Sequence, residues 1–317
     1  MTLPDSLAAR LDPVYANWLL ASNPPVPAGF QPTLEQMRAG FARQASISND
    51  AVDNAPARED RTVTGRDGHA IPIRLYRHET CEDSPATCVF VHGGGWVLGN
   101  LDTHDGICVD LALRTGLNVV SVDYRLSPEH PFPAALHDTL DVLTSLADAS
   151  MALGLDMTGY RLAADSAGAS LAVSACLCLR DQVALPARLA LIYPALGADM
   201  ERPSFAENRD VPGLSPELMR FFFVSYVGGE TLPDPLAAPL TVAALDGLPA
   251  TFIGAAELDP LRDDATDFAA RLDSSGTPVQ LHTAGGLGHG YLWVRRQSPA
   301  ARDAFTAVVD FLLPDTH

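Results

Sequence analysis

Short apolar runs alternate with longer segments of helical periodicity from about residue 60 to the end of the chain. Several runs are almost purely apolar, which is typical of strands covered on both faces. The segments between them repeat apolar residues three and four positions apart, as amphipathic helices do. The predicted strands are 70–78, 87–94, 118–125, 160–165, 188–194, 250–256 and 278–284.

This alternation of strands and helices predicts an α/β fold with a mostly parallel sheet and helices on both of its faces. The first two predicted strands are joined by too few residues for a crossover helix. We therefore expect that edge of the sheet to be antiparallel.

Two segments depart from the alternation. Residues 1–50 have a helical, proline-punctuated pattern, with Trp18 and Phe30 among their apolar residues. Residues 198–235 contain a phenylalanine-rich helix pattern after an Asp-Val-Pro-Gly turn. The aromatic residues of this helix cannot all face one core, so a second apolar surface, such as the roof of a pocket, is predicted.

The composition limits which classes of partner and which cellular compartment we expect for the protein. The 317 residues are 47% hydrophobic and 19% charged, as in a globular protein, and the net charge is −18. That charge argues against nucleic acids and anionic membranes as partners, because both are polyanions. The N-terminal apolar stretch is short and interrupted by charges, unlike a secretory signal or a membrane span. Five cysteines without CxxC spacing favour buried thiols in a reducing compartment, so we expect a cytoplasmic protein.

A candidate nucleophile lies in "AADSAGAS" (163–170), where a predicted strand ends and a helix begins. Such a turn lifts a serine hydroxyl above the carboxyl edge of the sheet, next to the free N–H groups of the helix. Ser166 fits Gly-x-Ser-x-Gly except that Ala164 replaces the first glycine. The alternative interpretation is an ordinary serine at a helix N-terminus.

A glycine loop follows the strand that precedes this turn, in "VHGGGWVLGN" (91–100). Consecutive glycines are entropically costly unless the backbone must approach something closely. In a hydrolase, N–H groups here face the oxygen that gains charge in the transition state. The alternatives are a turn with no binding role and a loop that binds phosphate. The glycines form neither of the nucleotide-binding motifs, Gly-x-Gly-x-x-Gly or a loop that ends in Gly-Lys-Ser/Thr. We expect His92 to hold the loop in shape, and Trp96 to pack under the helical segments with partial exposure to the acyl pocket.

A nucleophilic serine needs a base, and the base needs a carboxylate to orient it. His289 follows the last predicted strand in a glycine-rich loop, "GGLGHGYLW". Asp259 precedes a proline at the end of another strand, whereas Asp263 and Asp264 fall in the following helix. The order Ser166, Asp259, His289 is the order of an α/β-hydrolase triad.

With these residues in place, the chain resembles the bacterial branch of the hormone-sensitive-lipase family (group IV) of α/β-hydrolase esterases. The resemblance covers about residues 90 to 313. It rests on "HGGGWVLGNLDTHD" (92–105), "VDYRLSPEHPFPAALHD" (122–138), "ADSAGASLA" (164–172), "AELDPLRDD" (256–264) and "GHGYL" (288–292).

The resemblance implies an α/β-hydrolase fold of about eight strands with a helical cap. Residues 1–50 and 198–235 would form the cap, and residues 51–197 and 236–317 the catalytic core. It implies a Ser166–His289–Asp259 triad and an oxyanion hole formed by the backbone of Gly94, Gly95 and Ala167. Supporting roles would fall to His92, Gly93 and Glu257, and weaker substrate contacts to Trp96 and Asp165. The family usually has glycines where Ala164 and Ala169 stand here, which affects the fine geometry of the turn.

The implied activity is carboxylesterase hydrolysis of short- to medium-chain acyl esters through an acyl-enzyme. An amidase, lactonase or carbamate hydrolase could use the same triad. A non-catalytic receptor on this fold, as among plant hormone receptors, would lack the catalytic histidine. The expected partner is a small-molecule ester, with no metal and no organic cofactor. Relatives often form homodimers through the edge strand near 278–284, and the resemblance implies such a dimer.

Overall fold

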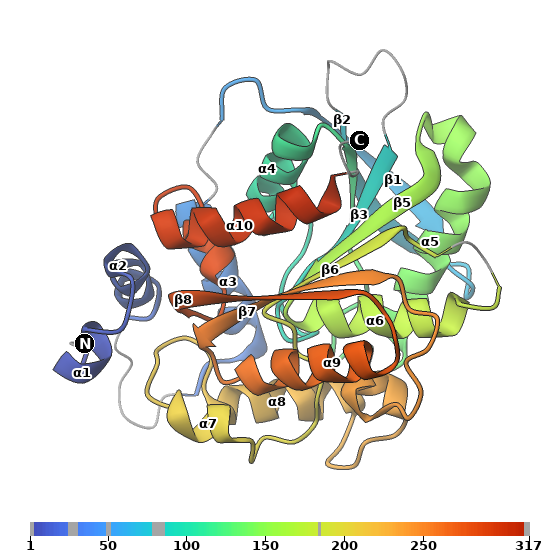
Figure 1. The fold of residues 1–317 in the computed structure, drawn as a ribbon. Coiled ribbons are helices and arrows are strands. Elements are labelled where there is room, and N and C mark those ends of the chain that lie inside the picture. The colour runs from blue at the N-terminus through green and yellow to red at the C-terminus, as the bar shows by residue number, and fades with distance from the viewer. Residues whose placement is uncertain (1–2, 25–30, 49–51, 78–85, 183–184, 314–317) are drawn as a thin grey trace.

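The protein was analysed as a computed structural model that describes residues 3–24, 31–48, 52–77, 86–182 and 185–313. An eight-stranded sheet with the order β1-β2-β4-β3-β5-β6-β7-β8 forms its centre (Figure 1). All neighbours from β4 to β8 pair in parallel, while β1 and β2 are antiparallel. The strands are β1 Ala57–Thr64, β2 Ala70–Arg77, β3 Ala86–Val91, β4 Asn118–Val122, β5 Asp156–Asp165, β6 Arg188–Ile192, β7 Ala250–Leu258 and β8 Val279–Gly288.

The predicted fold class is confirmed, and the antiparallel edge is where it was expected. The pairing at this edge differs from the simplest expectation, in which β2 would pair directly with β3. Instead, β2 lies between β1 and β4, and β3 lies on the other side of β4. The strand that the sequence pattern missed is β1, whose sequence AREDRTVT buries only Val63. An edge strand exposed on both faces carries no apolar alternation from which it could be recognised.

Helices cover both faces of the sheet. On one face pack α4 (Asp105–Thr115) and α10 (Pro299–Leu312), which also contact each other (Figure 1). On the other face pack α5 (Ala134–Leu153), α6 (Ala167–Leu179) and α9 (Arg262–Ser274). The central strands are accordingly buried on both sides, as their apolar sequences require.

The two segments that depart from the alternation fold as helices and short turns. Residues 3–48 contain α1 (Asp5–Ala8), α2 (Pro13–Ser22) and α3 (Leu34–Ser48). Residues 198–235 contain α7 (Pro203–Glu207) and α8 (Pro216–Val227). The described part of the chain after residue 234 also contains the short 3₁₀ turns η1 Pro235–Ala237, η2 Pro239–Thr241 and η3 Tyr291–Val294. The division into a cap and a core remains a prediction, and Phe30 lies outside the described residues.

The aromatic side chains of α8 face different surroundings, as its sequence predicts. Phe222, Phe223 and Tyr226 are buried, whereas Phe221 is 40% exposed. The ring of Tyr226 stacks on that of Trp96 with centroids 4.4 Å apart. This contact ties α8 to the segment that follows the glycine loop. None of the described helices is long and apolar enough to cross a membrane.

Candidate active site

Ser166 occupies a sharp turn between β5 and α6. Its backbone has φ +48° and ψ −120°, in the left-handed region that side chains other than glycine rarely adopt. Helix α6 begins at the next residue, so its first N–H groups point toward the serine. Gly168 allows the close approach of helix and strand, because a Cβ there would lie 2.2 Å from the carbonyl oxygen of Val91. Ala164 and Ala169 are both fully buried in this packing.

Three side chains form a continuous hydrogen-bonded chain at the carboxyl edge of the sheet. The Oγ of Ser166 lies 2.9 Å from Nε2 of His289. The Nδ1 of His289 lies 2.8 Å from Oδ2 of Asp259. The structure therefore brings together the predicted nucleophile, base and acid, although they are separated by up to 123 positions in the sequence.

Asp259 is fixed by its own turn. It is 1% exposed, and its Oδ1 accepts a hydrogen bond of 2.9 Å from the backbone N–H of Leu261. Only Oδ2 is left to face His289, and it can accept the proton on Nδ1. Nε2 is then the free acceptor that faces the hydroxyl of Ser166. This tautomer is the one that general-base catalysis needs.

The glycine loop places free amide groups beside the serine. Gly94 has φ +119° and Gly95 has φ +62°, conformations that glycine adopts without strain. Within the described ranges, the amide nitrogens of Gly94, Gly95 and Ala167 donate no hydrogen bond. A Cβ on Gly95 would come within 2.3 Å of the Phe222 ring, so only glycine fits between the loop and α8.

A buried polar network holds the glycine loop. The Oδ1 of Asp165 accepts a 2.7 Å hydrogen bond from the N–H of Gly93. Burial alone would raise the pKa of Asp165, but His104 and the Gly93 amide outweigh it and leave the pKa below its ordinary value. The carboxylate of Asp165 thus holds the loop, and because Asp165 also lines the cavity over Ser166, its expected contact with substrate stays a prediction.

His92 supports the same loop from within the core. Its Nδ1 lies 2.8 Å from the carbonyl oxygen of Gly93, and its ring stacks on Tyr124 with centroids 4.3 Å apart. The Tyr124 hydroxyl donates a 2.8 Å hydrogen bond to the carbonyl of His92. Burial lowers the pKa of His92 to about 3, with a further contribution from His104. The ring is therefore neutral at physiological pH and acts as a hydrogen-bond donor.

Substitution of His92 by asparagine tests this buried neutral state. Below its ordinary pKa of 6.5 the unfolded chain binds a proton at His92 that the folded protein rejects, so acid favours unfolding. We expect the wild type to lose about 2 kcal/mol more unfolding free energy than His92→Asn between pH 7 and pH 5. Urea unfolding of both proteins at the two pH values measures the difference, in which titrations common to both cancel. An equal loss in both proteins would show that His92 is protonated in the fold.

The other candidate residues have clear places. Trp96 is 1% exposed and donates from Nε1 to Ser170 Oγ at 3.0 Å, so the expectation that it partly lines the acyl pocket is wrong. Glu257 accepts a 2.8 Å hydrogen bond from the N–H of Gly286, on the strand that leads to His289. Among the described residues, no group of three or more His, Cys, Asp or Glu side chains could hold a metal ion.

A cavity of about 530 Å³ opens over the triad. Its floor includes Ser166, His289 and Gly94. Its walls come mainly from the two segments predicted to form the cap, and their larger side chains include Trp18, Leu19, Phe41, Leu214, Met219 and Phe222. An apolar cavity with a few polar groups at its base is the usual form of a small-molecule site.

Sequence reasoning missed Tyr15 and Asn208. The Tyr15 hydroxyl donates a 2.7 Å hydrogen bond to the carbonyl of His289, and Nδ2 of Asn208 donates a 3.1 Å bond to the carbonyl of Asp259. Both come from segments far from their partners in the chain and bind backbone atoms. A backbone partner leaves no pattern of residue types in the sequence, so no signal was available to find them.

Comparison with known proteins agrees with this geometry. Residues 88–293 match a family model described as the alpha/beta hydrolase fold. The chain is 40% identical over 252 residues to the carboxylesterase NlhH of Mycobacterium tuberculosis, covering 78% of this chain and 79% of that protein. It is 32% identical over 288 residues to an ethyl acetate hydrolase of Pseudomonas putida, covering 88% and 89%. A solved esterase of Pyrobaculum calidifontis superposes with a TM-score of 0.86 at 31% identity, covering 95% and 98%.

Proposed function

The chain belongs to the hormone-sensitive-lipase family of α/β-hydrolases and is a carboxylesterase, and from this premise we propose the roles of its site residues and its range of esters. Ser166 is the nucleophile, His289 the general base and acid, and Asp259 the carboxylate that orients the imidazole. The amides of Gly94, Gly95 and Ala167 form the oxyanion hole. The observation that carries this proposal is the hydrogen-bonded chain from Ser166 through His289 to Asp259, beside three unpaired amides.

In the acylation half-reaction, Oγ of Ser166 attacks the ester carbonyl carbon while Nε2 of His289 takes the hydroxyl proton. The carbonyl oxygen gains a negative charge, which the three amides stabilise by about 3 kcal/mol each. The intermediate then collapses, the bond to the alcohol oxygen breaks, and His289 returns its proton to the departing alcohol. The acyl group remains as an ester on Ser166.

Deacylation repeats the sequence with water as the nucleophile. His289 takes a proton from water as the water oxygen attacks the acyl carbon. Collapse of the second tetrahedral intermediate breaks the bond to Oγ, and His289 returns the proton to Ser166. The acid leaves, and the triad is restored to its starting protonation state. Asp259 stabilises the imidazolium formed in both half-reactions and stays ionised throughout.

The cavity supports a preference for acyl groups from acetyl to about hexanoyl. Each methylene buried against its apolar walls contributes about 0.8 kcal/mol to binding. Methylenes that extend beyond a cavity of about 530 Å³ remain in water and contribute nothing. Long-chain triglyceride substrates therefore fit the site less well than small esters.

A series of p-nitrophenyl esters from acetate to palmitate, with matched p-nitroanilides, tests the range of esters. We expect kcat/KM to peak at or below hexanoate, because the cavity is then filled, and to be at least about tenfold lower for palmitate. The anilides should be hydrolysed far more slowly than the esters. A steady rise from butyrate to palmitate would overturn the short-chain proposal, and faster hydrolysis of the anilides would favour an amidase.

Two further properties are proposed for the whole protein. Cytoplasmic location is supported by the free thiols of the described cysteines, Cys88, Cys108, Cys176 and Cys178, while Cys81 lies outside the described residues. Recovery of the protein outside the cytoplasm on cell fractionation would contradict this location.

A homodimer is supported by the position of β8 at the edge of the sheet, where Leu281 is 42% exposed. A molar mass of 33.7 kDa in solution, which is the mass of a single chain, would contradict the dimer.

A further inference from the structure

Helix α7, in the segment predicted as part of the cap, packs on the turn that carries the triad acid. The Oγ of Ser204 donates a 2.5 Å hydrogen bond to the carbonyl of Pro260, directly after Asp259. The Nδ2 of Asn208 donates a 3.1 Å bond to the carbonyl of Asp259 itself. Ser204 and Asn208 are 0% and 1% exposed. Among the described residues, loss of the Ser204 hydroxyl would leave the buried carbonyl of Pro260 without a donor, whereas the carbonyl of Asp259 would keep only its 3.1 Å bond from the N–H of Arg262.

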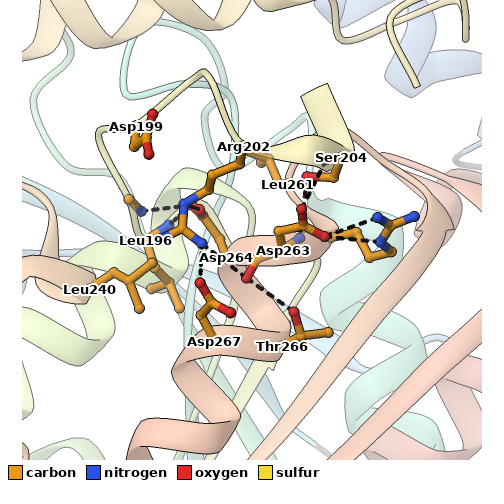
Figure 2. A network of polar contacts seen from close by, with 12 residues as sticks. Leu196, Asp199, Arg202, Ser204, Leu240, Leu261, Asp263, Asp264, Thr266 and Asp267 are labelled. Atoms are coloured by element: carbon orange, nitrogen blue, oxygen red, sulfur yellow. Dashed lines mark hydrogen bonds and ion pairs between the residues drawn. The ribbon is translucent and has the colours of Figure 1, made fainter. Parts of the chain in front are cut away.

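A reciprocal pair of bonds fixes where α7 meets the turn. The backbone N–H of Ser204 donates to Oδ2 of Asp263 at 2.9 Å, and the N–H of Asp263 lies 3.4 Å from Oγ of Ser204 (Figure 2). Asp259 is therefore held from two directions. The N–H of Leu261 binds its side chain from within the turn, and Asn208, at the C-terminal end of α7, binds its carbonyl from outside the turn.

Asp264 extends the contact to the nucleophile. It is 2% exposed, and its Oδ2 accepts hydrogen bonds from the N–H groups of Leu196 at 3.0 Å and Gly197 at 2.7 Å. A Cβ on Gly197 would lie 2.7 Å from Oδ1 of Asp264, so this approach requires glycine. The N–H of the adjoining Ala195 donates a 3.1 Å bond to the carbonyl of Ser166.

Arg202 closes the network from the start of α7. Its Nε lies 3.5 Å from Oδ1 of Asp264, and its Nη1 donates to the side chain of Asp267 (Figure 2). Burial raises the pKa of Asp264 to about 6, while the two amides and Arg202 oppose that rise. The carboxylate thus accepts hydrogen bonds from the two amides at the strand edge and forms an ion pair with Arg202 of the segment predicted as cap.

We propose that Ser204 and Asn208 are positioning residues for the triad, which hold the Asp259 turn from the cap side through contacts locked to the Ser166 segment by Arg202 and Asp264. The inference rests on the proposed role of Asp259. Neither residue is among those that line the cavity, so neither is expected to contact substrate. Their effect reaches the reaction through the distance between Asp259 and His289.

This placement predicts a particular kinetic signature. A displacement of the triad acid weakens general-base catalysis for every ester equally, because it acts on the histidine and not on the acyl chain. A change in a cavity wall alters binding, and alters it more for longer chains. The two kinds of residue can therefore be separated although both belong to the segment 198–235.

The test compares two variants. Asn208→Leu removes the Nδ2 hydrogen-bond donor but keeps a side chain of similar volume, whereas Leu214→Ala shortens a side chain in the cavity wall. For Asn208→Leu we expect kcat to fall about tenfold for acetate and hexanoate esters alike, with KM within about twofold. The downfield proton resonance of the Nδ1–H of His289 should shift or broaden. Leu214→Ala should leave this resonance in place and change KM in a chain-length-dependent way.

Circular dichroism establishes whether each variant folds. If Asn208→Leu does not fold, Ser204→Ala is measured instead, with an expected length-independent loss in kcat of about threefold. Unchanged kcat and an unchanged resonance in the folded variant, with only a lowered melting temperature, would overturn the positioning role. Absence of the downfield resonance from the wild type would instead refute the proposed triad.

Discussion

Substitution of Ser166 by alanine is expected to lower kcat roughly 10⁶-fold, the scale of loss found when a triad enzyme loses its nucleophile. The expectation follows from the position of Oγ, 2.9 Å from Nε2 of His289 at the base of the cavity. Alanine removes the atom that forms the acyl-enzyme. It keeps a Cβ in the same backbone conformation, so the packing of β5 and α6 should not change.

The measurement is the burst of p-nitrophenol released from p-nitrophenyl acetate, with thermal unfolding as the test of folding. The wild type should release about one equivalent per active site if deacylation limits turnover, and Ser166→Ala none. Ser46→Ala, at an exposed serine of α3 whose Oγ donates to the carbonyl of Arg43, is the matched control and should behave as the wild type. Turnover by Ser166→Ala within tenfold of the wild type would exclude Ser166 as the nucleophile.

Substitution of Asp259 by asparagine is expected to lower kcat roughly 10⁴-fold through the wrong histidine tautomer. The N–H of Leu261 donates to Oδ1, so the asparagine should place its oxygen there and its NH₂ toward His289. Nδ1 of His289 would then accept a hydrogen bond, and Nε2 would carry the proton. A protonated Nε2 cannot take the proton of Ser166.

The pH dependence of kcat/KM and the kcat of Asp259→Asn provide the measurement. Asp273→Asn, at an exposed aspartate near the end of α9, is the control and should retain full activity. The loss in Asp259→Asn should appear with all esters, since the carboxylate does not contact the acyl chain. Near-normal kcat in this variant would assign the orienting role to another carboxylate.

The central strands, the convergence of the three proposed triad residues and the glycine loop were predictable because each has a local signal in the sequence. Buried parallel strands such as β4, NVVSV, appear as apolar runs, and Ser166 and Asp259 each follow such a run. His289 follows the more polar edge strand β8, and its signal is the glycine-rich loop after that strand. Parallel strands bring their carboxyl ends to one edge of the sheet. Residues that follow several strands therefore meet there whatever their separation in the chain.

Other features have no such signal. The polar edge strand β1 lacks the alternation of apolar and polar residues that would mark a buried face. The local sequence of Trp96, after three glycines, does not show that Tyr226 would cover its ring. The contact of Asn208 with the carbonyl of Asp259 depends on where a distant segment folds back over the sheet. Such contacts are decided by tertiary packing and require the structure.

The central claim is that Ser166, His289 and the three loop and helix amides act on one reacting carbonyl. A crystal structure of the enzyme after reaction with an alkyl fluorophosphonate tests it most directly, because the phosphonyl oxygen imitates the oxyanion. The phosphorus should be bonded to Oγ of Ser166, with that oxygen within hydrogen-bonding distance of the amides of Gly94, Gly95 and Ala167. Phosphorus on another residue, or an oxygen directed away from these amides, would contradict the account.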